Sequence, residues 1–346
     1  MIWPFAPSSE LIEACEWLTD VAPAYDGEVR VSLREQPLRD FAMTHAANSK
    51  AQAVARAIAN EGGHVLLPEW PAQYVGAAHS GASVSLPDGP VVVWADADNC
   101  EQTTVASGVL GTVVTARASA RIVPLLSCRL SDSWSNSRSA GRWAVMQASF
   151  QTADGADVAS SDLYPIFDGL PLVLNGDVVG AGSYNESSEW ELDTTDNGIG
   201  LPDDVAARLR PSEQFGARWL ARGADYRALR AWIYSRRGRY LPFWLPSWAA
   251  DDVGAFSQVG TVVVVARYDP AETALLLFGG ASPLPALIST ATAVVGGWQL
   301  TLSATPGAIS RIMYLRRVRF NADRVEFRHA ASEPVSVAVQ CVRVAA

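Results

Sequence analysis

The chain has 346 residues, of which 49% are hydrophobic and 18% charged, and its formal net charge is -9 at pH 7. This composition supplies enough apolar side chains for a sizeable core and argues against wholesale disorder. The acidic balance argues against a general nucleic-acid-binding protein, which normally carries a basic surplus. No stretch reaches the roughly 18 uninterrupted apolar residues of a membrane span, and no signal peptide is expected because a basic region followed by an apolar run is missing.

Residues 1–28 are predicted to form an N-terminal arm. Apolar residues such as Trp3, Phe5 and Trp17 are interspersed with prolines. A serine that can cap a helix precedes the apolar run, so we expect a short helix around residues 9–18.

Residues 29–80 predict a strand, a helix and a second short strand. Val29, Val31 and Leu33 alternate with polar residues, which indicates a half-buried strand with this apolar side toward the core. A helical stripe that ends at Ile58 comes next, and Gly62 is suited to terminate the helix. The segment Leu66-Leu67-Pro68-Glu69-Trp70 follows.

The same order recurs in residues 206–250. Phe215, Ala217 and Trp219 form one face of a predicted strand, and a helix capped by Asp225 and stopped by Gly238 follows. Trp244-Leu245-Pro246-Ser247-Trp248 then matches the earlier Leu-Pro-x-Trp segment. We interpret the pair as an internal duplication. The residues expected to pin each helix onto its sheet are Leu66, Pro68, Trp70, Phe243, Trp244, Pro246 and Trp248.

The other segments consist of short β-branched runs separated by turn residues. They form a central β-rich region, 81–205, and a C-terminal β-rich region, 251–346, that completes the second half. Near the C-terminus, Val318 and Phe320 are predicted to pair with Val325 and Phe327 in a hairpin. The expected fold is mainly β with a few short helices (α+β), built from duplicated sandwich or barrel units that each carry one helix on the sheet.

The sequence contains no metal-binding histidine spacing, nucleophile elbow, phosphate loop or dinucleotide fingerprint. The aspartates of 96–98 and 193–196 could bind calcium, but solvated turns are the simpler interpretation. We therefore predict no catalytic residue, metal site or cofactor, and a protein that is not an enzyme.

Three segments resemble tail-tip proteins of long-tailed bacteriophages and their prophage relatives. The first contains Trp-Leu-Thr-Asp-Val at 17–21, Tyr-Asp-Gly at 25–27, and Leu33-Arg34 followed by Pro37 and Arg39. The second is Gly-Arg-Tyr-Leu-Pro-Phe-Trp-Leu-Pro-Ser-Trp at 238–248, and the third is the Arg-Phe-x-x-Asp-x-x-Glu segment that begins at Arg319. The region 80–205 carries no such motif.

The resemblance implies a distal tail or baseplate protein of the virion, made in the bacterial cytoplasm. Such a protein would form a ring, as a hexamer or as a trimer of duplicated chains, between the tail tube protein and the baseplate hub with its receptor-binding fibres. DNA would pass through without sequence-specific binding, and an acidic channel wall would fit that role. Residues considered for contacts with neighbouring subunits are Trp3, Phe5, Trp17, Arg230, Arg236 and Arg237.

The alternative is a β-sandwich module that binds or cleaves carbohydrate. Trp94, Trp134, Trp143 and Trp190 could stack on sugars if they shared an open face. Their exposure is the observation that discriminates between the two interpretations.

Overall fold

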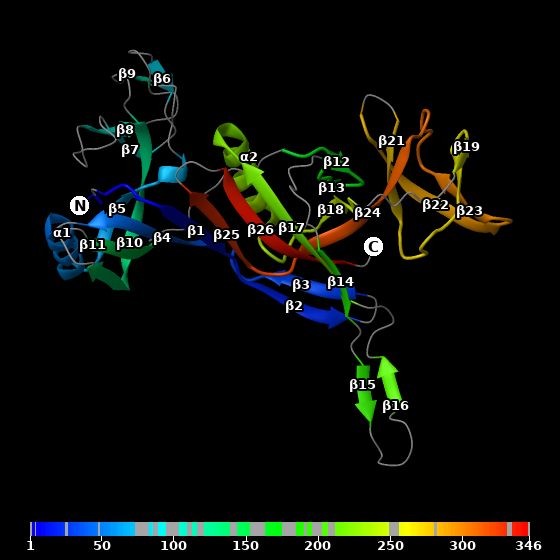
Figure 1. Ribbon diagram of the computed structural model, residues 1–346, viewed down its shortest axis with the longest axis horizontal. Coiled ribbons are helices and arrows are strands. Elements are labelled where there is room, and N and C mark those ends of the chain that lie inside the picture. Colours follow the sequence, from blue (N-terminus) through cyan, green and yellow to red (C-terminus); the bar gives the residue numbers. More distant parts are fainter. Residues whose placement is uncertain are drawn as a thin grey trace.

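The computed structural model describes residues 2–3, 5–24, 27–47, 49–72, 83–85, 89–94, 104–108, 113–115, 121–138, 144–152, 163–174, 185–189, 192–195, 203–206, 212–248, 256–279, 282–330 and 334–344. It is mainly β, with a large antiparallel sheet and two α-helices among these residues (Figure 1). The predicted fold class is confirmed at this level. No helix in the described part of the chain has the length and apolar character needed to cross a membrane.

The first unit is an antiparallel sheet with one helix. Its strands are β1 (Glu10–Glu16), β4 (Leu38–Ala47), β5 (His64–Pro68), β10 (Arg121–Arg138) and β11 (Ala144–Thr152), and its helix is α1 (Ser49–Asn60). The strands pair in the order β1, β4, β11, β10, β5. The predicted central region therefore contributes β10 and β11 to this unit.

The second unit has the same plan. Its strands are β14 (Asn185–Glu189), β17 (Ser212–Ala221), β18 (Phe243–Pro246), β24 (Arg311–Phe320), β25 (Arg324–Ala330) and β26 (Val335–Arg343), and its helix is α2 (Gly223–Arg236). The pairing order β14, β17, β26, β24, β18 matches that of the first unit strand for strand.

The strand registers of the two units also correspond. Pro68 lies opposite Leu125, and Pro246 lies opposite Leu315. Phe41 pairs with both Glu13 and Phe150. Its counterpart Phe215 pairs with both Glu186 and Cys341.

Smaller elements extend from these two units. A separate hairpin is formed by β2 (Thr19–Ala24) and β3 (Gly27–Ser32), and the short η1 (Trp70–Ala72) follows β5. An insertion after β5 contains β6 (Ser83–Ser85), β7 (Gly89–Trp94), β8 (Thr104–Gly108) and β9 (Val113–Thr115). Between the units lie β12 (Ile166–Phe167) and β13 (Leu170–Pro171), and β15 (Leu192–Thr195) and β16 (Asp203–Ala206) lie between β14 and β17 of the second unit. An insertion after β18 contains β19 (Ser257–Val259), β20 (Val262–Val265), β21 (Ala274–Phe278), β22 (Leu284–Val294) and β23 (Gly297–Leu302).

Strand β1 joins the two units into one sheet. On one side Glu13 lies opposite Phe41 of β4, and on the other it lies opposite Phe327 of β25. Because directly paired residues point to the same face of a sheet, Phe41 and Phe327 project to one side. Phe41 packs in the core that contains α1, and Phe327 packs in the core that contains α2. Both helices therefore cover the same face of the joined sheet.

The N-terminal arm differs from its prediction. Residues 9–18 do not form a helix, because β1 occupies residues 10–16 and is paired along both edges. The alternation of Leu11, Glu13 and Cys15 has the period of a strand, and partners on both sides outweigh the local helical signal.

The predicted strand at 29–34 exists in part as β3, but its orientation is reversed. Val29, Val31 and Leu33 are exposed by 58%, 50% and 59%. Glu28 and Arg30 instead face the second unit, because each forms polar contacts there. Satisfying these charged groups takes precedence over burial of the apolar side of this two-stranded hairpin.

The predicted C-terminal hairpin is also wrong in its pairing. Val318 lies opposite Arg343, and Phe327 lies opposite Val337, so β24 and β25 each pair with β26. The bend between them turns the chain along the sheet, and this bend carries Asp323.

Candidate functional site

A buried cluster of charges lies where the two units meet. Glu13, Arg39 and Glu69 come from the first unit, and Arg230 comes from α2 of the second. All four are at most 7% exposed. Arg39 donates to Glu13 Oε1 through Nε at 3.0 Å and Nη2 at 2.8 Å, and Arg230 does so at 3.1 Å and 2.7 Å. Both arginines also donate to Glu69 Oε1. We call these four residues the charge cluster.

Helix α2 supplies further donors to the same carboxylate. Tyr226 donates to Glu13 Oε2 at 3.0 Å, and Tyr234 donates to Oε1 at 2.9 Å. Residues 226, 230 and 234 are spaced by four, so they share one face of the helix. The Glu13 carboxylate of the first unit thus accepts hydrogen bonds from three residues on one face of α2 in the second unit.

Burial controls the protonation of the cluster. Burial and the nearby negative charge of Glu13 raise the pKa of Glu69 to about 7, although Arg39 opposes the shift. Burial by itself disfavours the charge of Arg39, but Glu69 and Glu13 raise its pKa well above the ordinary value. Burial, followed by the charge of Glu13, likewise raises the pKa of Tyr226. Arg39 therefore stays charged, and Glu69 is the member of the cluster whose pKa is raised to near neutral pH.

A second set of contacts lies beside the cluster and brings the three phage-like segments together. Asp323 accepts hydrogen bonds from the backbone N–H of Thr19 at 2.8 Å and of Arg239 at 3.0 Å. Arg239 Nη2 donates to the carbonyl of Thr19 at 2.7 Å, and Trp17 N–H donates to the carbonyl of Asp323 at 3.1 Å. We call Trp17, Thr19, Arg239 and Asp323 the clasp. Although partial burial opposes ionisation, the backbone hydrogen bonds from Arg239 and Thr19 lower the pKa of Asp323.

The hairpin β2–β3 extends the clasp. Arg319 Nη2 donates to Glu28 at 2.6 Å, and Arg30 Nη1 donates to the carbonyl of Tyr240 at 2.7 Å. The N-terminal segment is therefore fixed to the second unit at several points, rather than forming a free arm.

The packing residues predicted from the repeated segment line the interior. Pro68, Phe243 and Pro246 are buried, Trp70 and Trp244 are 6% and 3% exposed, and Leu66 and Trp248 are half-buried. Phe243 packs edge-to-face against Trp232 of α2, with ring centroids 5.2 Å apart. Trp244 faces the other way, into a core with Leu172, Leu276 and Met313.

Most of the residues predicted to contact neighbouring subunits are buried inside the chain. Trp3, Phe5 and Trp17 are 0%, 9% and 1% exposed, and Arg230 belongs to the charge cluster. Because these four side chains are buried inside one chain, they are not placed to contact a neighbouring subunit, which corrects the expectation. Arg236 and Arg237 are half-buried at the end of α2, and burial lowers the pKa of Arg236 to about 10.

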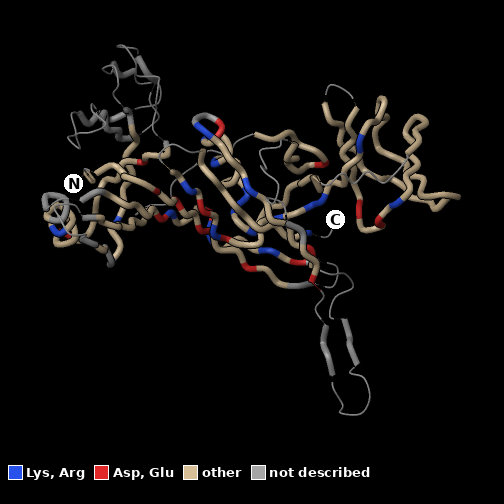
Figure 2. The backbone as a smooth tube through the Cα atoms, in the orientation of Figure 1, with Lys and Arg blue, Asp and Glu red and all other residues tan. Residues whose placement is uncertain are grey.

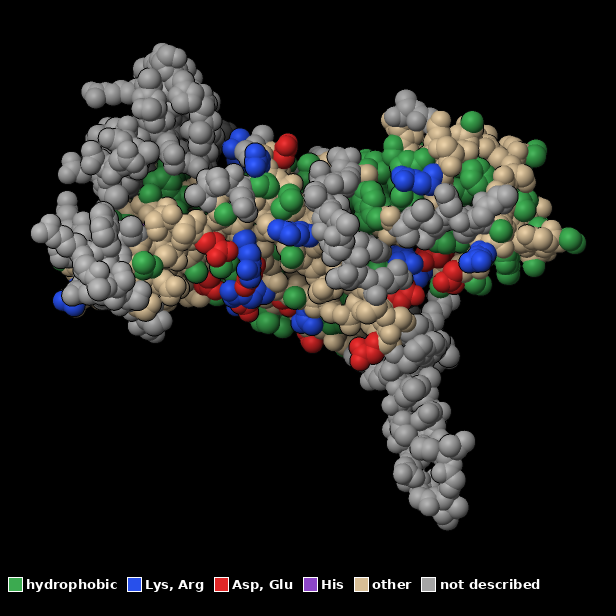
Figure 3. Space-filling view, viewed as in Figure 1, with side chains coloured by type: hydrophobic (Ala, Val, Ile, Leu, Met, Phe, Trp, Pro, Cys, Tyr) green, Lys and Arg blue, Asp and Glu red, His purple; other side chains and the backbone are tan. Residues whose placement is uncertain are grey.

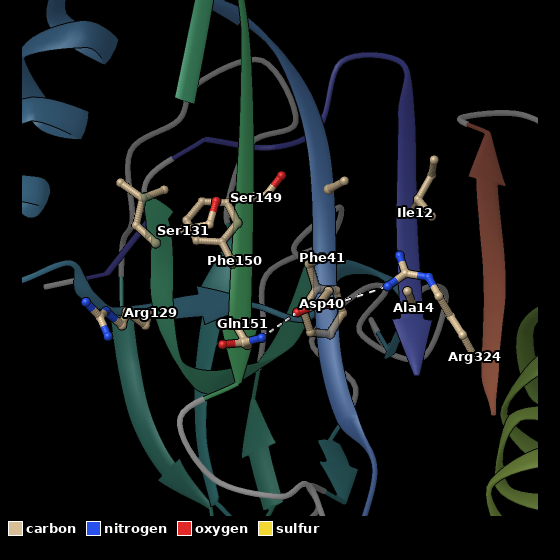
Figure 4. Close-up of a pocket in the computed structure, with 12 residues that line it drawn as sticks. Ile12, Ala14, Asp40, Phe41, Arg129, Ser131, Ser149, Phe150, Gln151 and Arg324 are labelled. Atoms are coloured by element: carbon tan, nitrogen blue, oxygen red, sulfur yellow. Dashed lines mark hydrogen bonds and ion pairs between the residues drawn. The ribbon is translucent and has the colours of Figure 1, made fainter. Parts of the chain in front are cut away.

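The opposite face of the joined sheet carries a groove of about 390 Å³ that is lined by both polar and apolar side chains (Figure 4). Asp40 lies at its centre, where it accepts a hydrogen bond from Gln151 at 3.2 Å and pairs with Arg324 of the second unit at 3.6 Å. The groove spans β1, β4, β10 and β11. It lacks a nucleophile–base pair among its lining residues.

Other candidate sites receive little support from the described ranges. No group of three or more His, Cys, Asp or Glu side chains there could hold a metal ion. Residues 96–98 lie outside the described residues, as do Trp143 and Trp190. The side chains of Asp193, Trp94 and Trp134 also lie outside the description.

Only indirect signals for the charge cluster are present in the sequence. Glu13 occupies a core-facing position in the alternation Leu11, Glu13, Cys15, where a carboxylate needs a buried partner. Glu69 replaces the serine of the second Leu-Pro-x-Trp segment. Arg39 belongs to a phage-like motif and Arg230 is predicted to contact a neighbouring subunit, and their convergence depends on how the units pack.

No protein-family model matches the chain, and a search among curated proteins finds no match.

Gly238→Ala should strongly destabilise the clasp. Gly238 has φ +60, and an added Cβ would lie 2.6 Å from Asp323 Oδ1 and 2.9 Å from its Cα. Gly260 has φ +59 with nothing within 4 Å, so Gly260→Ala is a matched control. The control should lower the free energy of unfolding by about 1–2 kcal/mol, because alanine is strained in the left-handed backbone conformation. Gly238→Ala should lower the free energy of unfolding clearly more. Chemical denaturation measures both, and equal costs would contradict this view of the clasp.

Glu13→Ala should destabilise the protein by about 3–5 kcal/mol, because two buried arginines lose a shared partner. Glu326→Ala removes an exposed carboxylate that pairs with Arg324 and Arg328 at 3.3 Å and 3.2 Å. That control should cost about 0–1 kcal/mol. Similar denaturation midpoints for the two variants would show that the buried charge cluster contributes no more to stability than the Glu326 ion pairs do.

Glu69→Gln should remove a pH dependence of stability. The folded-state pKa of Glu69 is raised to about 7, so the folded protein binds this proton more tightly than the unfolded chain does. The corresponding stability is fully present below the unfolded pKa and is lost as pH rises through about 7. The wild type should therefore lose stability relative to Glu69→Gln between pH 5 and pH 8. Parallel curves of unfolding free energy against pH for the wild type and Glu69→Gln would argue against protonation of Glu69.

Proposed function

We propose that this chain is a structural protein of a phage tail tip that forms a ring between the tail tube and the baseplate hub, without catalysis. The observation that carries the proposal is the joined sheet. Two units with the same strand order and register lie edge to edge, with both helices on one face (Figure 1). A repeated unit joined head to tail through sheet edges is suited to the wall of a ring.

The open face of the sheet fits a channel wall. Its exposed or half-buried side chains include charges of both signs, as Arg324, Arg328 and Arg218 lie among Asp40 and Glu326, together with the apolar Ile12 and Ala42. Figure 2 shows positions of both charges interspersed along the backbone in this middle part of the molecule, and Figure 3 shows blue and red side chains on the same part. A wall of mixed charge would bind passing DNA weakly, and the expectation of a uniformly acidic wall is replaced by this one.

The matching registers support the proposal that the two units arose by duplication. The Leu-Pro-x-Trp strands align at Pro68 and Pro246, and the flanking strands align without a slip. In each unit the insertion follows the same strand, either β5 or β18. A trimer would then present six such units, and a hexamer twelve.

The hairpin β2–β3 supports an assembled state. Leu18, Val29, Val31 and Leu33, all at least 46% exposed, lie on its outward side together with Asp20, which pairs with Val31. Exposed apolar side chains gathered on one side of a hairpin are typical of interaction sites. In the proposed assembly it would contact the tail tube protein or the hub.

The proposal predicts a ring in solution. The purified full-length protein should have the mass of three or six chains by light scattering, and negative-stain images should show an open channel. A monomer at every concentration, which also fails to bind isolated tail tubes, would overturn the proposal. A glycan array would then test the carbohydrate-binding alternative.

A further inference from the structure

We propose that copies of this chain join by antiparallel pairing of β14 of one copy with residues 134–138 of β10 in the next. The contact would reproduce, between copies, the β1–β25 junction inside one chain. This inference rests on the proposed ring and specifies the strands and the register that close it.

Residues 134–138 occupy the position of β25 in the other unit. Asn136 pairs with Met146 of β11, and Phe327 pairs with Val337 of β26. Met146 in turn lies opposite His45, and Val337 lies opposite Trp219. A bulge between Leu130 and Trp134 separates this part of β10 from the rest, as the bend at 321–323 separates β25 from β24.

Strand β14 occupies the position of β1. Glu186 lies opposite Phe215, as Glu13 lies opposite Phe41. Inside the chain Glu13 also lies opposite Phe327. The same register between copies places Glu186 opposite Asn136, and Ser187 opposite Ser135.

Both strands end the joined sheet. Among the described strands, β14 pairs with β17, and residues 134–138 pair with β11. They belong to opposite ends of the sheet, with β10 and β11 at the left and β14 at the lower right of Figure 1. An unpaired edge is a template for another strand, and pairing both edges of every copy removes this liability.

A charged pair supports the same contact independently. Inside the chain Arg230 of the second unit reaches across to Glu13 of the first, with Nη2 at 2.7 Å. When α1 and α2 are aligned from their first residues, Ser49 corresponds to Gly223, and Arg56 is then the counterpart of Arg230. The buried positions agree with this alignment, since they are Ala55 and Ile58 in α1 and Leu229 and Trp232 in α2.

The counterpart pair therefore consists of Arg56 and Glu186. These residues belong to α1 and β14, at opposite ends of the sheet, so they cannot repeat the internal contact within one copy (Figure 1). Arg56 is exposed. Pairing of β14 with residues 134–138 would bring Arg56 of one copy to Glu186 of another. A second copy of this chain thus satisfies both the strand edges and the charges.

Cysteine cross-linking tests the register in the full-length chain. Ser135 and Ser187 are exposed, and directly opposed residues in antiparallel strands are about 4.5–5.5 Å apart at Cα, within disulfide range. S135C/S187C should give a ladder of covalent oligomers under mild oxidation. S135C/S188C is the matched control, because Ser188 is also exposed but projects to the other face. The wild type reports any reaction of native thiols.

Charge reversal tests the pair. R56E alone and E186R alone should each weaken association between copies by at least about tenfold, since like charges then meet at the contact. The double variant R56E/E186R should return to within about threefold of the wild type. Circular dichroism checks that each variant is folded.

The outcomes separate this inference from the proposed function. A ladder confined to S135C/S187C, with rescue by the double reversal, supports the contact. Rings that form without this ladder, or a ladder of equal strength in S135C/S188C, overturn the contact and leave the ring in place. Failure of the wild type to assemble, alone or on tail tubes, overturns both.

Discussion

Burial of one carboxylate at the centre of β1 is the constraint on which the rest of the structure depends. Glu13 is 0% exposed, and a buried carboxylate must be paired and fully hydrogen-bonded. Arg39 meets part of this need from the same unit, and Arg230 meets the rest from the other. Because neither half can satisfy Glu13 alone, the two units are held in one relative position. The continuous sheet across the junction agrees with that requirement.

The clasp protects the same junction from the outside. It joins segments that are about 300 residues apart, since Thr19 and Asp323 are separated by 304 positions. The three segments that resemble phage tail-tip proteins meet here. Their residue choices have local physical causes: Gly238 leaves room for Asp323, Arg239 binds both Asp323 and Thr19, and the prolines of the repeated segment stiffen a buried strand.

The two halves are alike in plan but differ in the chemistry at their equivalent positions. Glu69 of the first unit corresponds to Ser247 of the second, and the donors Tyr226 and Tyr234 belong to α2. The internal junction is therefore equipped for permanent burial, whereas the outer edges retain only the counterparts Arg56 and Glu186. An assembly that must form reversibly from separate copies is expected to use a less buried version of the contact.

The sequence by itself determined the mainly β class, the helix followed by a short strand in each unit and the burial of the Leu-Pro-x-Trp segments, because these features have local periodicity and local stop signals. The strand that precedes α1 is β4 and not the predicted strand at 29–34. Prediction from the sequence was wrong where contacts with distant segments determine the local structure. Residues 10–16 became a strand because β4 and β25 offer partners on both edges, and β3 turned its valines outward because Glu28 and Arg30 find partners in the second unit. The charge cluster, the clasp and the shared face of the helices were decided by the tertiary structure alone, because each requires groups from distant segments to meet in a volume that excludes water.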